Sequence, residues 1–187
     1  GLRALNANTT GADNTAMGRD ALYVNTTGAN NTAVGAFALD ANTTGIYNTA
    51  SGAYALQANT TANSNTAMGY LALYANTTGI QNTAVGDQAA SSVTTGQYNT
   101  ILGYKAGEYL TGLTTGNSNT LVGSYSRSTT VGSLAANVFG HDVAGAAEYT
   151  TIGYGAADIR AAHGISSWAA VSDERYKKDI VDSTAGL

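Results

Sequence analysis

The feature that most constrains this chain is a glycine that recurs every 17 residues. Seven glycines, from Gly1 to Gly103, stand at this constant spacing. Between them runs one pattern, G-x-x-A-L-x-A-N-T-T-G-x-x-N-T-A-[V/M], which residues 69–85 keep as GYLALYANTTGIQNTAV. A fixed period of this kind is typical of stacked architectures, in which each repeat packs only against its neighbours.

A period of 17 residues is too short for helical-pair repeats, which need about 33 to 47 residues. It suits one coil of a β-solenoid or β-roll, with two short strands and two turns. Thr-Ala-Val/Met favours a strand, Asn-Thr-Thr-Gly is turn chemistry, and the recurring Gly indicates a bend against the next coil. The segment G-x-x-A-L-x-A is compatible with either a strand or one helical turn. The sequence therefore predicts an elongated all-β stack.

The pattern loosens toward the C-terminus. Residues 86–102 keep the length but have Ala90 in place of Leu and Val93 in place of the first Asn, and the next unit carries three extra residues. Beyond Gly123 only echoes remain, at 129–132 and 150–153. Terminal units of an array are commonly atypical. We therefore expect a repeat shaft over 1–123 and an irregular distal tip over 124–171.

Two Asn positions recur in every regular unit. Stacked at the same point of successive coils, their amides can hydrogen-bond along the axis as a ladder. The same residues form Asn-Thr-Thr and Asn-Thr-Ala, which are acceptor sequons for N-glycosylation. We favour the ladder, because the repeat itself generates every sequon.

Composition argues against several classes of partner. Only 11% of residues are charged, with eight Lys and Arg and a net charge of −4, which argues against nucleic acid or an anionic membrane surface. No apolar run approaches 18 residues, so membrane insertion is not expected. The chain has no Cys, hence no disulfide or thiolate metal site. No phosphate-loop motif follows the glycines, and we expect no cofactor.

The apolar content of each unit is small: Ala, Leu, and Val or Met. Burial yields about 25 cal/mol per Å², so a single thin stack would gain little. Identical copies joined around an axis would bury a second face. The array over 1–123 resembles the head repeats of trimeric autotransporter adhesins and, more closely, similar repeats in phage tail fibres. That resemblance implies a homotrimer, a number that periodicity does not supply.

The last residues differ in charge from the rest. The stretch V-S-D-E-R-Y-K-K-D-I-V reads as the start of an amphipathic helix, with Ser172 as N-cap and acidic residues in the first turn. It also resembles the opening of the intramolecular chaperone domain of endosialidase-type tail spikes and fibres. The matching pattern, Ser-Asp-x-Arg-x-Lys-x-x-Ile, falls on Ser172, Asp173, Arg175, Lys177 and Ile180.

This second resemblance implies a domain that assembles three chains and is then released by self-cleavage. Ser172 would be the nucleophile and Lys177 its base, because a desolvated Lys can accept a hydroxyl proton. The family's domain is much longer than residues 172–187, which we expect to be its truncated beginning. The side of Ser172 on which the chain is cut stays open.

The expected tip contains most of the candidate ligand-binding side chains. Exposed rings beside polar groups suit a sugar-binding surface, although the same rings could simply pack the tip. The candidate receptor-binding residues are Tyr125, Phe139, His141, Tyr149 and Tyr154. Trp168 is expected to pack. His141-Asp142 and His163 could bind a metal on a trimer axis, but two lone histidines are too few for us to expect one.

Together these patterns predict a segment of a homotrimeric phage tail fibre, located in the virion tail, that mediates attachment to a host cell-surface receptor, most simply a glycan. A fibre of a phage-derived injection device is a close variant. The first alternative is a trimeric adhesin displayed on a bacterial surface, and the second is a capsule-degrading tail spike. We expect no enzyme activity beyond single-turnover autoproteolysis at Ser172.

Overall fold

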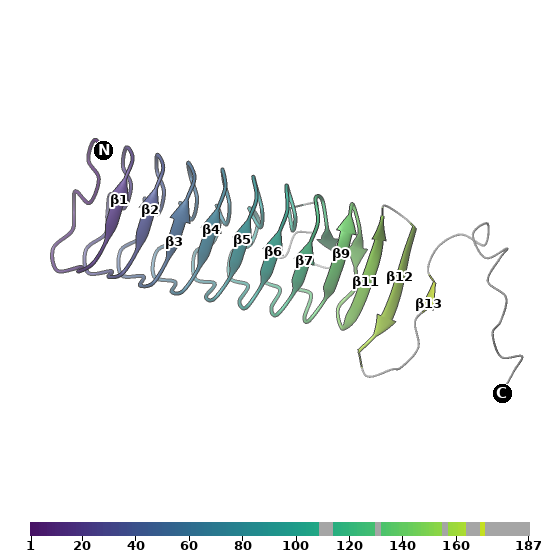
Figure 1. Cartoon of the computed structure of the whole chain (residues 1–187). Helices are drawn as coiled ribbons and strands as arrows, with labels where there is room; N and C mark the ends of the chain where they lie inside the picture. The colour runs from purple at the N-terminus through teal and green to yellow at the C-terminus, as the bar shows by residue number, and fades with distance from the viewer. Residues whose placement is uncertain (109–113, 130–131, 155–156, 164–168, 171–187) are drawn as a thin grey trace, which may run out of the picture.

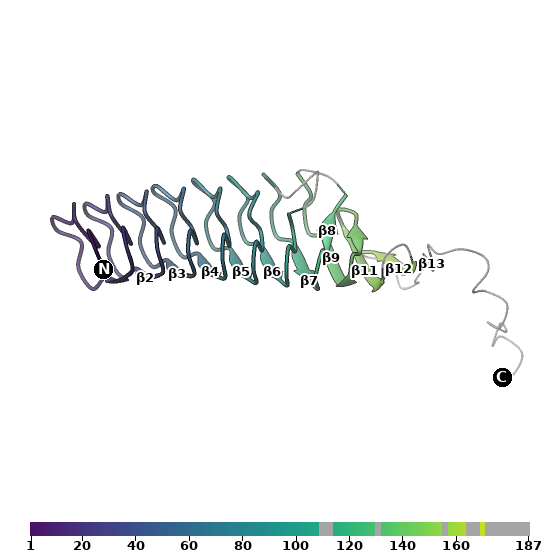
Figure 2. The same ribbon diagram turned by 90° about the horizontal axis from the view of Figure 1, so that it is seen from above.

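The computed structural model describes residues 1–108, 114–129, 132–154, 157–163 and 169–170. These residues form an elongated all-β stack and contain no helix, so none is long and apolar enough to span a membrane. Figure 1 shows the chain winding from the N-terminal end to the C-terminal end with its strands side by side. Figure 2 shows the strands along one side of the stack and the turns along the other. The prediction of a β-solenoid built from 17-residue coils is confirmed.

Eleven strands form one sheet in the order β1-β2-β3-β4-β5-β6-β7-β9-β11-β12-β13, and β8 and β10 form a separate parallel pair. All contacts in the main sheet are parallel as far as β11; β12 and β13 are antiparallel. The strands are β1 Thr15–Met17, β2 Thr32–Val34, β3 Thr49–Ser51, β4 Thr66–Met68, β5 Thr83–Val85, β6 Thr100–Leu102, β7 Thr120–Val122, β8 Arg127–Ser128, β9 Asn137–His141, β10 Ala144–Gly145, β11 Tyr149–Tyr154, β12 Ala157–Ala162 and β13 Ala169–Ala170.

Each regular coil contributes one three-residue strand, in a register that follows the repeat. Thr49 pairs with Thr66 and Ala50 with Ala67, 17 residues apart. The middle residue of each strand points inward, so Ala50 and Ala67 are fully buried, and the residues on either side face outward.

The expectation of two strands per coil is wrong, as are both readings of the G-x-x-A-L-x-A segment. This segment is a series of turns, in which the third and fifth residues have positive φ. In the coil that starts at Gly52 these are Tyr54 at 61° and Leu56 at 52°. Left-handed residues interrupt both a strand and a right-handed helix, which explains the difference.

The turn segments are nevertheless hydrogen-bonded from coil to coil as a strand would be. The amide of Leu56 donates to the carbonyl of Ala72 in the next coil, at 3.0 Å, and that of Tyr54 donates to Ala36 in the previous coil, at 2.9 Å. The recurring glycine permits this close stacking. Gly69 has a φ of 136°, and a Cβ placed there would lie 2.3 Å from the carbonyl oxygen of Gly86.

Two Asn ladders run through the interior. In the first, Asn42 Nδ2 donates to Asn25 Oδ1 at 2.8 Å and to Gly45 O at 3.1 Å, and Asn59 Nδ2 donates back to Asn42 Oδ1 at 2.9 Å. The ladder stops where Val93 replaces Asn, and Asn76 Oδ1 is a buried atom without a hydrogen-bond partner among the described residues. The predicted Asn ladder is therefore present, and it ends at the unit in which the repeat loses this Asn.

The second ladder extends from Asn14 to Asn119 and combines side-chain and backbone donors. Asn65, for example, donates from its backbone N and from Nδ2 to Asn48 Oδ1, at 3.0 and 3.3 Å, and from Nδ2 to Gly79 O at 2.9 Å. At the C-terminal end of this ladder the donor to Asn119 Oδ1 is the backbone N of Ala136, not an Asn. The buried Asn residues therefore have structural partners.

A single substitution in the turn pattern disturbs the stacking locally. Ala62 stands where the other units have Gly. Beside it, the hydrogen bond from Thr60 N to Thr77 O lengthens to 3.3 Å, whereas the equivalent bond from Thr43 N to Thr60 O is 2.8 Å. The extra methyl group separates the two coils slightly at this edge.

The core is a column of small and medium side chains. Each regular coil buries one Leu, such as Leu56 or Leu73, together with Ala residues. In the coil of residues 86–102, Ala90 replaces this Leu, and the inward-facing residue of the strand is Ile101 instead of Ala. A Cβ on Gly107, at the same place in the following coil, would lie 3.3 Å from Ile101 Cδ1. Ile101 therefore fills the space that two shortened side chains leave.

The strand stack continues beyond Gly123. Asn137 in β9 pairs with Thr120 in β7, and Thr150 in β11 pairs with Asn137. The partial repeat at 150–153 thus lies in the sheet. The rung before it is formed by residues 137–140, not by 129–132, and it begins with Asn instead of the usual Thr. Antiparallel β12 then covers the last edge of the parallel stack.

We predict that Asn42→Val destabilises the chain by about 2–4 kcal/mol, because it orphans the buried Asn25 Oδ1 and removes the donors and the acceptor of Asn42. Asn76→Val is the matched control. Its Oδ1 already lacks a partner, so this variant should cost at least about 1 kcal/mol less. Urea unfolding of both variants measures the difference, and equal costs would count against the ladder.

We predict that Ile101→Ala costs about 2–5 kcal/mol, because it opens a cavity next to Ala90 and Gly107. The double variant with Ala90→Leu restores the side chains of the regular coil and should recover part of this loss. Thermal unfolding of the two variants, with Ala90→Leu alone as control, measures the coupling. A double variant that is no more stable than Ile101→Ala would refute the volume exchange.

Candidate receptor-binding surface

The two residues that follow the recurring Gly form a corner at which side chains project outward. The second of them has positive φ, as in Tyr125 at 58° and Asp142 at 54°. Because coils stack in register, side chains at this corner follow one another along the axis. Toward the C-terminal end the corner carries Tyr104, Tyr125, His141 and Tyr154, which we call the aromatic corner.

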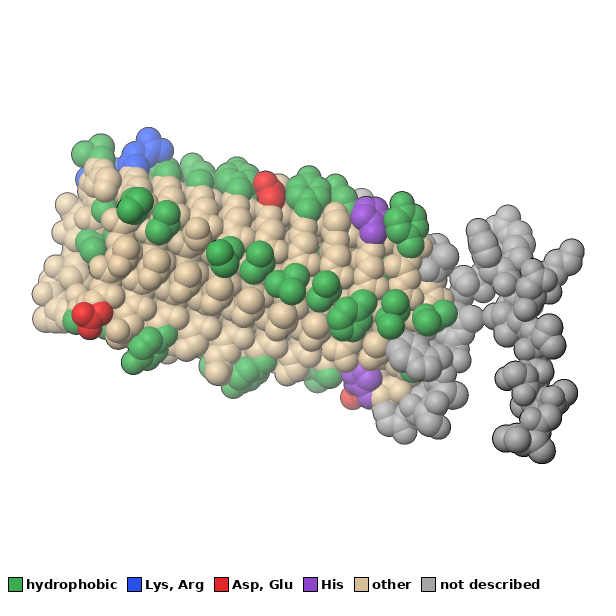
Figure 3. Space-filling view, in the orientation of Figure 1, with side chains coloured by type: hydrophobic (Ala, Val, Ile, Leu, Met, Phe, Trp, Pro, Cys, Tyr) green, Lys and Arg blue, Asp and Glu red, His purple; other side chains and the backbone are tan. Residues whose placement is uncertain are grey.

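The rings of the aromatic corner are in contact in series. The centroids of Tyr104 and Tyr125 lie 5.3 Å apart at an interplanar angle of 88°, and those of Tyr125 and His141 lie 6.0 Å apart at 75°. His141 and Tyr154 are stacked, at 5.1 Å and 19°. Figure 3 shows hydrophobic and histidine side chains gathered along this upper edge of the stack. Tyr154 is 71% exposed and ends the row, so one face of its ring has no neighbouring ring in the row.

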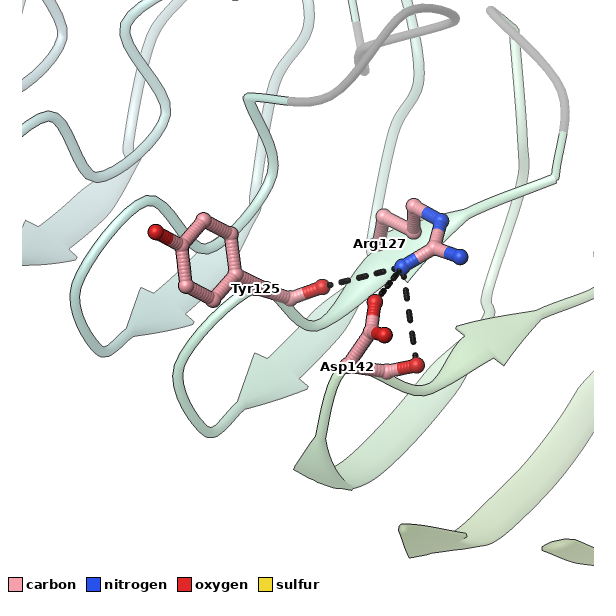
Figure 4. A network of polar contacts seen from close by, with 3 residues as sticks. All are labelled: Tyr125, Arg127 and Asp142. Carbon is pink, nitrogen blue, oxygen red and sulfur yellow. Dashed lines mark hydrogen bonds and ion pairs between the residues drawn. The ribbon is translucent and has the colours of Figure 1, made fainter. Parts of the chain in front are cut away.

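A charged pair supports the turns beneath these rings. Arg127 in β8 forms an ion pair with the carboxylate of Asp142, and its Nη1 also donates to the carbonyl oxygens of Tyr125, at 3.4 Å, and Asp142, at 3.5 Å. Figure 4 shows the guanidinium reaching both turns. Arg127 thus joins the turn that holds Tyr125 to the turn that follows His141.

The polar atoms of the corner also influence one another. The pKa of Tyr125 is raised, mainly by the hydrogen bond of its side chain with Tyr104 and then by burial. The positive charge of Lys105 acts against this rise. The ammonium of Lys105 lies 3.4 Å from Glu108 and 5.8 Å from the centroid of the Tyr104 ring. The corner therefore presents ring edges, one exposed ring face, hydroxyl groups and an ammonium group, which can make apolar and hydrogen-bonding contacts with a polyhydroxy ligand.

Three of the five candidate receptor-binding residues meet in this corner: Tyr125, His141 and Tyr154. The other two do not. Phe139 lies in β9 and faces outward from the sheet, in register with Val122 and Ile152. Tyr149 begins β11 opposite Ala162 and is half-buried. Position relative to the recurring glycine explains the division, because Tyr125, His141 and Tyr154 follow Gly123, Gly140 and Gly153, whereas Phe139 and Tyr149 precede that glycine within their strands.

Other predicted residues lie outside the described part of the chain. These are the chaperone-like residues Ser172, Asp173, Arg175, Lys177 and Ile180, the helix start predicted with them, and Trp168. The two histidines lie in different surroundings: His141 is stacked in the corner, and His163 Nε2 contacts Asn137 Nδ2 at 3.1 Å and Thr150 Oγ1 at 3.3 Å. In the described ranges, no three His, Cys, Asp or Glu side chains converge as a metal site.

Sequence reasoning missed the full extent of the corner. Tyr104 belongs to it but precedes the region expected to hold the tip. Nearer the N-terminus the same corner carries Phe37, Tyr54 and Tyr70, with ring centroids 5.1 and 6.2 Å apart, and Arg19 lies 4.6 Å from the Phe37 centroid. The 17-residue spacing of Phe37 and Tyr54 was a usable signal.

Comparison with known proteins adds no relative. The chain matches no protein-family model, no curated protein and no solved structure.

We predict that Tyr104→Phe lowers the pKa of Tyr125 toward its ordinary value, because the variant removes the hydrogen-bonding hydroxyl that raises it. Lys105→Gln should raise the same pKa further, because it removes a positive charge that favours the phenolate. Titration of ¹³Cζ-labelled tyrosine by NMR reports both changes. Shifts in the same direction in the two variants would contradict this arrangement of charges.

Proposed function

We propose that the chain is a segment of a homotrimeric attachment fibre, of the phage tail-fibre kind, that extends a glycan-binding surface toward a host cell. The observation that carries the proposal is the combination of a straight stack with a continuous row of rings at one corner. A stack of identical coils provides reach and stiffness. It also lets each ring stand at a fixed height along the axis.

The aromatic corner is the part that we assign to receptor contact. Its rings offer apolar surface to sugar C–H groups, and the neighbouring Lys105 and tyrosine hydroxyls offer hydrogen bonds to sugar hydroxyls. The row favours an extended ligand over a compact one, because the rings succeed one another along a line. A cell-surface glycan meets this description.

Placement in a virion tail, rather than on a bacterial surface, rests on the resemblance of the repeats and of residues 172–180 to tail-fibre sequences. The self-cleaving chaperone role of Ser172 and Lys177 is proposed on that ground alone. A bacterial adhesin of the same architecture and a capsule-degrading spike remain the alternatives.

We predict that fluorescently labelled chain binds host cells or an array of bacterial surface glycans, and that Tyr154→Ala weakens this binding about tenfold. That factor corresponds to the loss of about 1.4 kcal/mol from one aromatic contact. Tyr47→Ala is the matched control, because Tyr47 is 60% exposed but lies outside the corner. Equal loss in both variants, or none in either, would contradict the assignment. Shortened glycan chains after incubation would instead favour the capsule-degrading alternative.

A further inference from the structure

A second surface runs the whole length of the stack on the outward face of the main sheet. The last residue of each three-residue strand faces outward and is paired with its counterpart in the next strand. Met68 pairs with Val85, Phe139 with Ile152, and Ile152 with Ile159. We call this line of side chains the strand-face row. Its large exposed members are Met17, Met68, Val85, Phe139, Ile152 and Ile159.

The strand-face row is apolar at every rung except that of β3. Figure 3 shows it as a line of hydrophobic side chains that crosses the visible face over the strands. Met68 is 46% exposed and Ile152 is 43% exposed, whereas their inward-facing neighbours Ala67 and Thr151 are fully buried. Apart from β3, which has Ser51, every strand of the main sheet from β1 to β12 contributes an apolar side chain to the row. A contiguous apolar surface of this extent is typical of an interaction site.

The face beside the row carries no Asp, Glu, Lys or Arg side chain in the described main-sheet strands from β1 to β11. The first residue of each strand also faces outward, and it is Thr in β1 to β7 and Asn137 in β9. The rings of the aromatic corner and the charged side chains of Lys105 and Asp142 project from the corner instead. Two such faces can therefore approach each other without burying an ion, which would cost several kcal/mol per unpaired charge.

We propose that the strand-face row is the surface through which copies of this chain join, with the copies running parallel around one axis. This inference rests on the proposed homotrimer and names the face that would hold it together. Because a trimer with one three-fold axis relates its copies by rotation about that axis, each coil meets the same coil of its neighbours.

A second copy fits this face better than an unrelated partner, because the row has a fixed period. The strands repeat about every 4.8 Å, and another copy has the same rise at every rung. The ten main-sheet strands from β1 to β12 span about 43 Å, and three residues span about 10 Å. Each copy thus offers roughly 430 Å² of flat footprint, or about 860 Å² for a facing pair, close to the roughly 1,000 Å² at which specific interfaces begin. In a trimer each row is shared between two neighbours, so the three rows together bring about 1,290 Å² to the axis.

Cysteine reactivity tests this inference, because the chain has no native Cys. Three single-Cys variants are needed: Met68→Cys and Ile152→Cys in the row, and Tyr47→Cys outside it. Each is reacted with a bulky maleimide in the folded assembly, and its rate is divided by the rate for the urea-unfolded chain. Sedimentation measures the number of copies in the same samples.

The inference predicts a trimer in which Met68→Cys and Ile152→Cys react at least tenfold more slowly than Tyr47→Cys. A trimer in which all three react equally fast would overturn this inference and leave the homotrimer standing. A monomer would overturn both. As a second readout that does not depend on labelling, Met68→Asp with Val85→Asp should dissociate the trimer while circular dichroism of the coils persists. A trimer that survives both charges would also overturn the inference.

Discussion

Hydrogen bonds that run from coil to coil along the axis are the interaction on which the rest of the structure depends. Each regular coil holds three non-glycine residues with positive φ, such as Tyr54, Leu56 and Ser64. That conformation costs about 1–2 kcal/mol per residue, and the core supplies only one Leu and a few Ala to offset it. An isolated coil would not be stable. Neighbouring coils stabilise each coil, because they provide hydrogen-bond partners for its backbone groups and for its two buried Asn amides.

Repetition also determines where function can reside. Any side chain that recurs in register becomes a line along the stack. Two such lines differ in chemistry. The aromatic corner presents rings and polar atoms around Tyr125 and His141, and the strand-face row presents apolar groups such as Met68 and Ile152. We assign the first to a ligand and the second to other copies of the chain.

The 17-residue period was sufficient to predict the stack, its register, the role of the recurring glycine and the Asn ladders. It did not predict the left-handed turns, because Leu and Tyr locally disfavour positive φ and adopt it here under constraint from adjacent coils. The compensation of the small Ala90 by the larger Ile101 can be recognised only when both side chains are known to point inward. Of the candidate site, sequence reasoning found Tyr125, His141 and Tyr154 but placed Phe139 and Tyr149 with them, because the repeat is weakest there and does not show which aromatic residues follow the recurring glycine.

Hydrogen exchange at single amides tests the central claim most directly. The Leu56 amide, in a turn, and the Thr66 amide, in β4, belong to the same coil and both donate to the next one, at 3.0 and 2.8 Å. If axial hydrogen bonds hold the turns as firmly as the strands, both amides exchange only through cooperative opening and show similar protection. Rapid exchange at Leu56 beside a protected Thr66 would show that the strands alone hold the stack, and would contradict this account.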